Sequence, residues 1–194
     1  AAGAAGFYPL YAVWNNGLKV TATGGEDSIS NLQRSKLVGS VRTYVHTGNQ
    51  GLDMSAWFTG LREGRAFVST GPLVELTANE EGPGETVELP EGGGTIDIAA
   101  NVQSITPLDR LVLIWNGEVV EEISVGQDAT VSNPNSGSGS GTRLDFRRSL
   151  SVTTSGWLHL RAEGARSARF PLDASYAQAF TNPIWVTVGD QPPR

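Results

Sequence analysis

An acidic pair follows a double-glycine break near the start of the sequence, where the residue types suggest metal chemistry. The stretch V-T-A-T-G-G-E-D-S covers residues 20–28, so Glu26 and Asp27 come directly after the two glycines. Hard divalent cations prefer carboxylate oxygens, and barrel-like α/β folds place their active sites at strand ends. We therefore predict Asp27 as a metal ligand, with Glu26 better suited to solvent. The alternative is that Asp27 bonds its own backbone within the turn.

The strand-like run V-R-T-Y-V-H, residues 41–46, supplies the next candidates. Its alternation places Arg42 and His46 on one face. In a cleft both would contact a substrate, and the guanidinium would recognise an anionic group through paired hydrogen bonds. Arg62 and Arg65 invite the same interpretation. The alternative is that these residues are structural. The histidine would then form a hydrogen bond to the backbone, and the arginines would form ion pairs or lie near a helix C-terminus.

The second histidine and the tryptophans are expected to be structural. His159 alternates with leucines in G-W-L-H-L-R, which predicts that its side chain faces solvent. Four tryptophans lie in apolar runs and are expected in the core: Trp14, Trp57, Trp115 and Trp185. Trp157 follows a Ser-Gly turn and is expected to be more exposed. An exposed row of such rings would let the chain bind a glycan by stacking.

The composition narrows the classes of function. There is no cysteine and there are two histidines among 194 residues, which excludes disulfides and cysteine nucleophiles and leaves a zinc site short of ligands. The formal net charge of −6 disfavours a nucleic-acid partner. No apolar run approaches the roughly 20 residues of a membrane-spanning helix, so no membrane span is expected. No G-x-S-x-G elbow for serine catalysis occurs.

The elements that would position the candidate residues begin with a mixed region, residues 1–74. Two helices are expected there: one starts near Pro9 and ends at residues 16–17, and one follows a capping Asp53 and ends at Gly64. The apolar face of the second is expected to consist of Met54, Trp57, Phe58 and Leu61. Short strands are expected at residues 18–23, within residues 37–46 and at residues 66–70.

From about residue 75 the helical periodicity disappears, and short alternating runs predict strands. The runs are L-V-E-L-T-A, E-T-V-E-L, G-T-I-D-I-A-A-N-V, D-R-L-V-L-I-W, G-E-V-V-E-E-I-S-V, R-L-D-F-R-R-S-L-S-V, G-W-L-H-L-R-A and P-I-W-V-T-V. Asn116-Gly117 between two of them is a strong hairpin signal. Eight strands over roughly 120 residues are typical of an antiparallel, Ig-like β-sandwich. Residues 132–142, S-N-P-N-S-G-S-G-S-G-T, are expected to form a flexible loop.

The order of motifs over residues 7–76 resembles a known family. The motifs are an F-Y-x-L helix ending in N-x-G-L, then T-G-G-E-D, V-R-T-Y-V and A-W-F-T-G-L-R-E-G-R-A-F-V-S-T-G-P-L. This order is similar to the C-terminal part of the metallohydrolases related to CehA and McbA, in the polymerase and histidinol phosphatase (PHP) superfamily. The resemblance implies an α+β chain in two parts: a PHP-barrel-like α/β remnant in residues 1–74 and an Ig-like β-sandwich in residues 75–194.

The resemblance also implies a parent enzyme that hydrolyses esters, amides or phosphoesters with a divalent metal, which would be zinc, manganese or iron. In that superfamily a late strand ends in Gly-x-Asp, and the matching metal ligand here is Asp27. The residue two positions further on, often histidine in the family, is Ile29. The family's His-x-His pairs lie earlier in the barrel, and none occurs in this sequence. This chain alone is therefore expected to bind no metal and to be inactive.

The N-terminal stretch A-A-G-A-A-G-F-Y has neither a methionine nor a basic region, so a piece of a longer protein is expected. Its partner would be the missing N-terminal barrel portion, and two copies could associate to cover apolar surface that this portion leaves exposed. The family and the absence of cysteine favour a periplasmic or secreted location. The alternative hypothesis is a non-catalytic β-sandwich module that binds a glycan or a protein partner.

Overall fold

The computed structural model describes residues 7–25, 38–49, 51, 53–125, 142–166 and 176–192. Glu26, Asp27 and most of the Gly/Ser-rich loop lie outside these ranges. The helices are α2 (Tyr8–Asn15) and α3 (Met54–Arg62). The strands are β1 (Arg42–Val45), β2 (Ala66–Ser69), β3 (Leu73–Ala78), β4 (Thr86–Leu89), β5 (Gly94–Ser104), β6 (Arg110–Trp115), β7 (Glu118–Ser124), β8 (Thr142–Val152), β9 (Gly156–Arg166), β10 (Tyr176–Thr181) and β11 (Ile184–Val188).

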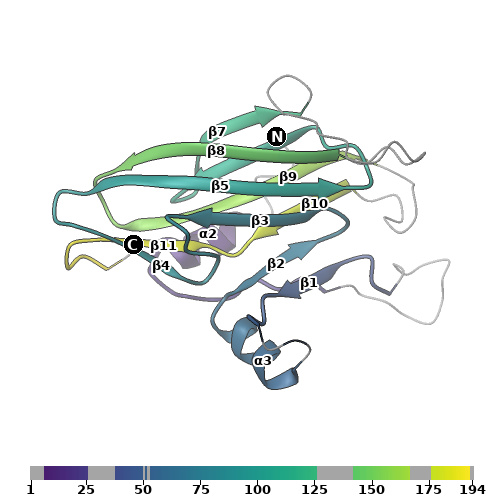
Figure 1. Cartoon of the computed structure of the whole chain (residues 1–194), viewed down its shortest axis with the longest axis horizontal. Helices are drawn as coiled ribbons and strands as arrows, with labels where there is room; N and C mark the ends of the chain where they lie inside the picture. The colour runs from purple at the N-terminus through teal and green to yellow at the C-terminus, as the bar shows by residue number, and fades with distance from the viewer. Residues whose placement is uncertain are drawn as a thin grey trace.

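Eight strands form one sheet around β9, which pairs along one edge with β6 and along the other with β10 and β11 (Figure 1). β6 continues into β7, β10 continues into β2 and β1, and β11 pairs in parallel with β4. Strands from both ends of the chain therefore lie side by side in one sheet. The predicted domain boundary at residue 74 assigns β2 and β10 to different domains, although these strands pair in one sheet. The division into two domains stays a prediction.

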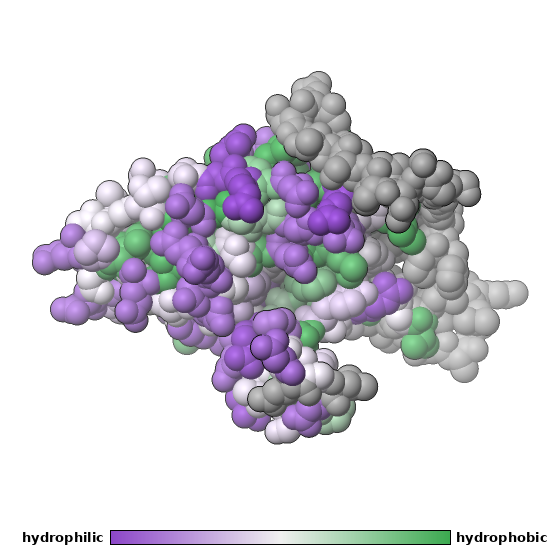
Figure 2. All heavy atoms as spheres, viewed as in Figure 1, coloured by the Kyte–Doolittle hydropathy of each residue, from purple (hydrophilic) through white to green (hydrophobic). Residues whose placement is uncertain are grey.

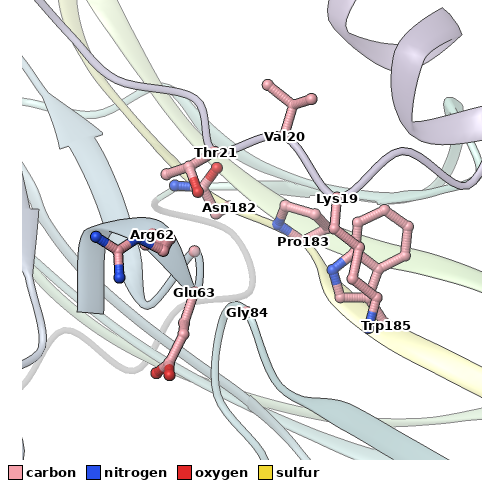
Figure 3. A pocket seen from close by; sticks show the side chains of 10 residues that line it. Lys19, Val20, Thr21, Arg62, Glu63, Gly84, Asn182, Pro183 and Trp185 are labelled. Atoms are coloured by element: carbon pink, nitrogen blue, oxygen red, sulfur yellow. The ribbon is translucent and has the colours of Figure 1, made fainter. Parts of the chain in front are cut away.

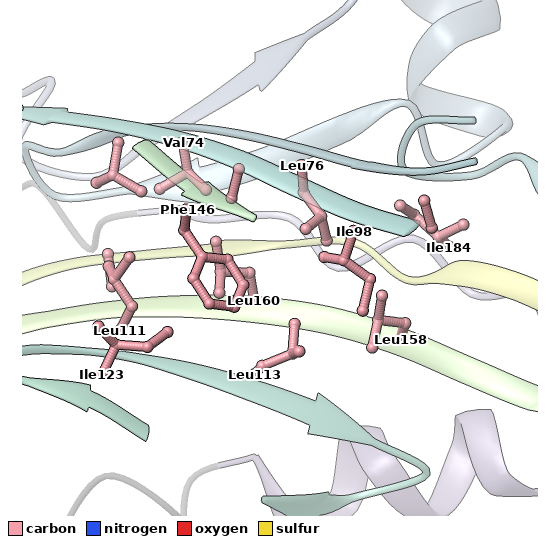
Figure 4. Packing of buried hydrophobic residues seen from close by; sticks show 14 of the residues in the cluster. Val74, Leu76, Ile98, Leu111, Leu113, Ile123, Phe146, Leu158, Leu160 and Ile184 are labelled. Atoms are coloured by element: carbon pink, nitrogen blue, oxygen red, sulfur yellow. The ribbon is translucent and has the colours of Figure 1, made fainter. Parts of the chain in front are cut away.

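The second sheet consists of β3, β5 and β8, with β5 in the centre. Alternating side chains of the two sheets bury a common aliphatic core, in which Leu158 and Leu160 of β9 face Ile98 of β5 and Phe146 of β8 (Figure 4). Complete burial of one such side chain contributes about 1.5–3 kcal/mol. The chain is therefore mostly β, with two packed sheets, as a β-sandwich requires.

The eight predicted strand runs are confirmed as β3 to β9 and β11. The Asn116-Gly117 hairpin is confirmed as well, since φ is 50° and 89° at these residues and β6 pairs with β7. Positive φ at both central residues is what a type I′ turn requires, and Asn-Gly accepts it most easily. The strand β10, with the sequence Y-A-Q-A-F-T, was not predicted.

The prediction of a strand at residues 18–23 is wrong, because this segment belongs to no helix or strand. Side chains bond the backbone of Val20 and Ala22, where a strand would bond to a neighbouring strand. Asn182 bonds both the N–H and the C=O of Ala22, and the ring N–H of Trp14 donates to the carbonyl of Val20. Alternation alone does not specify a strand when side chains satisfy the same backbone groups.

Both predicted helices form, but their surroundings differ. α2 begins with Pro9 in its first turn and buries Tyr11 and Trp14 against the outer face of the eight-stranded sheet. α3 is capped by Asp53, whose carboxylate accepts from the N–H groups of residues 55 and 56. Half of its predicted apolar face is uncovered, since Met54 and Phe58 are more than half exposed, whereas Trp57 and Leu61 are partly buried. The α3 region stands out as a separate lobe in Figure 2.

Candidate functional site

The segment that leads to the predicted metal ligand is fixed to the sandwich by Asn182. The side-chain oxygen of Asn182 accepts from the N–H of Ala22 at 2.7 Å, and its amide donates to the carbonyl of Ala22 at 3.1 Å. The same amide donates to the carbonyl of Ala66 at 3.0 Å. Asn182 is completely buried. A buried amide with all of these partners holds three chain segments in one arrangement.

A second pair of hydrogen bonds holds the backbone two residues later, at Gly24. Together with the bonds from Asn182 to Ala22, it forms what we call the double clamp. The Thr43 hydroxyl accepts from the Gly24 N–H at 2.9 Å and donates to the Gly24 carbonyl at 3.2 Å. Gly24 also needs to be a glycine, because a Cβ there would collide with Val68 and would lie 2.7 Å from Val41 Cγ1. Gly25, in contrast, has open space around it. The backbone just before Glu26 and Asp27 is therefore held on the outer face of β1 and β2.

Of the three candidates predicted from the sequence, Arg42 and His46 lie within the described residues. Asp27 lies outside the described residues. Arg42 begins β1 and is half-buried, whereas His46 follows β1 and is exposed. Four residues along an extended strand separate their Cα atoms by about 13 Å, so they lie at opposite ends of β1, and their role in substrate binding stays a prediction. The backbone N–H of His46 donates to the carbonyl of Arg65, which fixes the strand end and not the ring.

The described residues do not assemble a metal site. No group of three His, Asp or Glu side chains within the described ranges lies close enough to hold an ion. No catalytic step through a metal can therefore be derived from these residues. A metal bound as the resemblance implies would need ligands from outside them.

The predicted solvent position of His159 is wrong, because its ring is completely buried on the outer face of the sheet, beneath α2. Its Nδ1 lies 3.1 Å from the carbonyl oxygen of Thr181, which can only accept, so Nδ1 carries the proton. Nε2 then accepts from the Tyr11 hydroxyl at 2.8 Å. Burial, assisted by the nearby Arg161 guanidinium and opposed by the hydrogen bond to Thr181, lowers the pKa of His159 to about 3.

The Tyr11–His159 pair is neutral at pH 7 and is closed to substrate. Burial raises the pKa of Tyr11 to about 12, although Arg161 opposes the shift. Both ring nitrogens of His159 already have partners, and no part of the ring is exposed. A general acid or base must reach the reacting proton, so this pair fixes α2 on the sheet and does not form an active site.

The tryptophans do not form an exposed binding row in the described part of the chain. Trp157, expected near solvent, is completely buried and its ring N–H donates to Asn15 at 2.8 Å. Trp14 and Trp185 are buried in the same cluster, as expected of core residues, although this cluster lies outside the sandwich core. Trp57 and Trp115 are partly buried. Glycan stacking on these rings therefore has no structural support.

A cleft of about 210 Å³ lies where four chain segments meet (Figure 3). It is lined by Lys19, Val20, Thr21, Arg62, Glu63, Gly64, Gly84, Asn182, Pro183 and Trp185. The sequence suggested Arg62 as an anion-binding residue but gave no sign of Lys19. The two come together only because the segment at 18–23 crosses the end of α3, and no local pattern predicts that crossing.

No protein-family model and no curated protein matches this sequence. Of the described helices, neither is long and apolar enough to span a membrane.

Proposed function

We propose that this chain is the C-terminal part of a metal-dependent hydrolase similar to CehA and McbA, acting on an ester, amide or phosphoester. In this proposal the sandwich is an accessory scaffold that positions one barrel strand end, and the chain has no hydrolase activity by itself. The observation that carries the proposal is the double clamp at Ala22 and Gly24. It fixes the backbone three residues before Asp27, as a preorganised metal ligand needs.

The exposed apolar side of α3 supports the same proposal. Met54 and Phe58 are exposed, and within the described ranges α3 buries only Gly60. A Cβ at Gly60 would lie 2.7 Å from both the His46 carbonyl and Val45, so this side of the helix packs directly on the end of β1. A helix that belongs to a larger α/β domain would bury its other side against the remaining barrel. Association of two copies would cover it as well, and light scattering would detect this.

The experiment compares this chain with a version extended upstream in the gene. Metal content and hydrolysis of p-nitrophenyl acetate and p-nitrophenyl phosphate are measured for both. We expect metal and turnover only in the extended protein, and we expect Asp27→Ala to remove both. An extended protein that is metal-free and inert on both substrates would refute the hydrolase proposal.

Two glycine variants of the extended protein test the clamp. Gly24→Ala is expected to lower activity about 10²-fold, because a shift of about 1 Å in a catalytic group has an effect of this size. Gly25→Ala is the matched control, since its added Cβ meets nothing within 4 Å. Equal activities of the two variants would show that the clamp does not position the site.

The alternative function is a non-catalytic binding module. Glycan binding through tryptophan stacking is disfavoured by the burial of Trp14, Trp157 and Trp185. For a protein partner, α3 offers the exposed Phe58 ring. An inert extended protein would direct attention to that helix.

A further inference from the structure

The cleft at the end of α3 has features of a small-molecule site that the proposed hydrolase function does not use. Its walls are formed by residues 19–21, residues 62–64, Gly84, residues 182–183 and Trp185. Junctions between structural units are preferred places for ligand sites, and drug-sized ligands occupy about 300–1,000 Å³. A volume of about 210 Å³ therefore suits a more compact molecule.

The walls of the cleft are fixed without a ligand. The Thr21 hydroxyl donates to the Leu61 carbonyl at 2.8 Å, and the Gly84 N–H donates to the Pro183 carbonyl at 2.8 Å. The backbones of Gly64 and Gly84 are in contact, since a Cβ on Gly64 would lie 3.3 Å from the Gly84 Cα. Binding would therefore require little rearrangement, which reduces its entropic cost.

The charges that remain available in the cleft are positive. The carboxylate of Glu63 is paired with Arg65 at 2.7 Å. Lys19 Nζ lies 3.2 Å from the Thr86 hydroxyl and 5.4 Å from the centre of the Trp185 ring, and Arg62 is exposed. Within the described ranges neither Lys19 nor Arg62 forms an ion pair. This is a local cationic site on a chain whose net charge is −6.

The C-terminus of α3 offers another explanation for Arg62, because helix C-termini favour cations. However, the carbonyls of residues 59–61 already accept hydrogen bonds from Thr21 and from the backbone N–H groups of residues 63–65. The end of the helix is therefore capped without Arg62. Its guanidinium is free to bind a molecule in the cleft.

We propose that this cleft binds a compact organic anion through carboxylate or phosphate oxygens. Figure 3 places Lys19 and Arg62 on opposite sides, with Gly84 and Glu63 between them. Arg62 suits paired hydrogen bonds to anionic oxygens, and Lys19 supplies a point charge. The chemistry of the ligand is thus two anionic groups, or one anionic group with a polar end, on a short skeleton.

The test is a titration of this chain with succinate and with inorganic phosphate at constant ionic strength. The backbone amide signals of Gly64 and Gly84 are followed by NMR. We expect saturable shifts of these signals, and a response to only one anion would identify carboxylate or phosphate as the group that is recognised. Succinamide, which has the same skeleton without charge, is expected to cause no shift.

Variants locate the binding. Arg62→Gln and Lys19→Gln each remove one charge from an exposed side chain, and each is expected to weaken binding about tenfold. Arg143→Gln, on the exposed face of β8, is the matched control and is expected to change nothing. The proposal is overturned if neither anion causes a saturable shift, or if the shifts persist unchanged in both cleft variants.

Discussion

The two faces of the eight-stranded sheet are buried by different chemistry. The inner face packs aliphatic side chains against β3, β5 and β8. The outer face packs Tyr11 and Trp14 of α2 against Trp157, with His159 and Arg161 buried beside them. Residues 157–162 of β9 are consequently all buried. A strand covered on both faces can carry polar residues on one of them, provided that a helix supplies their partners.

The two faces of the sheet are expected to lose stability for different reasons when a buried side chain is substituted. Aliphatic packing is non-directional, so a lost methyl group costs its transfer free energy plus a cavity. The outer face depends on directional bonds, such as the one between Tyr11 and His159 at 2.8 Å. Loss of one partner there leaves the other buried without a hydrogen bond.

The largest effect is expected on the inner face. Leu160→Ala removes a completely buried side chain and should lower the free energy of unfolding by about 2–5 kcal/mol. Urea unfolding monitored by circular dichroism measures this loss. Leu73→Ala, on the exposed side of β3, is the control and should change stability by no more than about 0.5 kcal/mol. Equal effects of the two variants would contradict the assigned core.

The Tyr11–His159 pair should show coupling on the outer face. Tyr11→Phe and His159→Leu are each expected to cost about 1–3 kcal/mol, because each leaves a buried polar group unpaired. The double variant should cost less than the sum of the two. A double-mutant cycle from urea unfolding measures the coupling. Strictly additive effects would mean that the hydrogen bond does not contribute.

The buried histidine also predicts how stability depends on pH. The pKa of His159 is about 3 in the folded protein, against 6.5 ordinarily. Between these values the unfolded chain binds a proton that the folded chain does not, so stability falls as the pH falls from about 6.5 to about 3. The slope from this group is at most about 1.4 kcal/mol per pH unit, and above pH 6.5 the contribution is complete.

Unfolding experiments between pH 4 and pH 7 test this dependence. The carboxylates contribute to the slope in every variant, so the informative quantity is the difference between the parent chain and His159→Gln. Glutamine retains hydrogen-bonding groups but does not titrate. Identical slopes would show that His159 is accessible to protons in the folded state.

The smallest effect is expected where the outer face extends beyond α2. Val119 of β7 lies opposite Ile114 of β6 and is more than half exposed, whereas Ile114 is buried. Val119→Thr should change stability by no more than about 0.5 kcal/mol. Thermal unfolding measures this change. A large loss of stability would mean that this part of the sheet is covered by something beyond the described residues.

The sequence predicts the strands better than it predicts their neighbours. Alternation and the Asn116-Gly117 turn locate the runs from β3 to β9 and β11, because these signals are local. β10 escapes prediction, since its alanines give weak alternation. His159 is misplaced because alternation indicates which side chains share a face and not whether a helix covers it. Parallel pairing of β4 with β11 is a further non-local feature with no local signal.

Prediction of the site is limited in the same way. Asp53 as a helix cap is visible in the sequence together with its local partners at residues 55 and 56, whereas the glycine break at Gly24 is visible but its partner Thr43 is not. The clamp on Ala22 depends on Asn182, 160 residues away. Arg42 begins β1 and His46 follows it, and their role in substrate binding stays a prediction. The proposed role of Asp27 remains a prediction.

The arrangement of the large sheet also affects the order in which the chain can fold during synthesis. β2 and β4 are made early, but their partners β10 and β11 leave the ribosome only after roughly a hundred further residues. Until then both early strands have unpaired edges, and the Asn182 that fixes Ala22 is also absent. The nascent chain therefore exposes these edges to unwanted strand pairing until the C-terminal strands arrive.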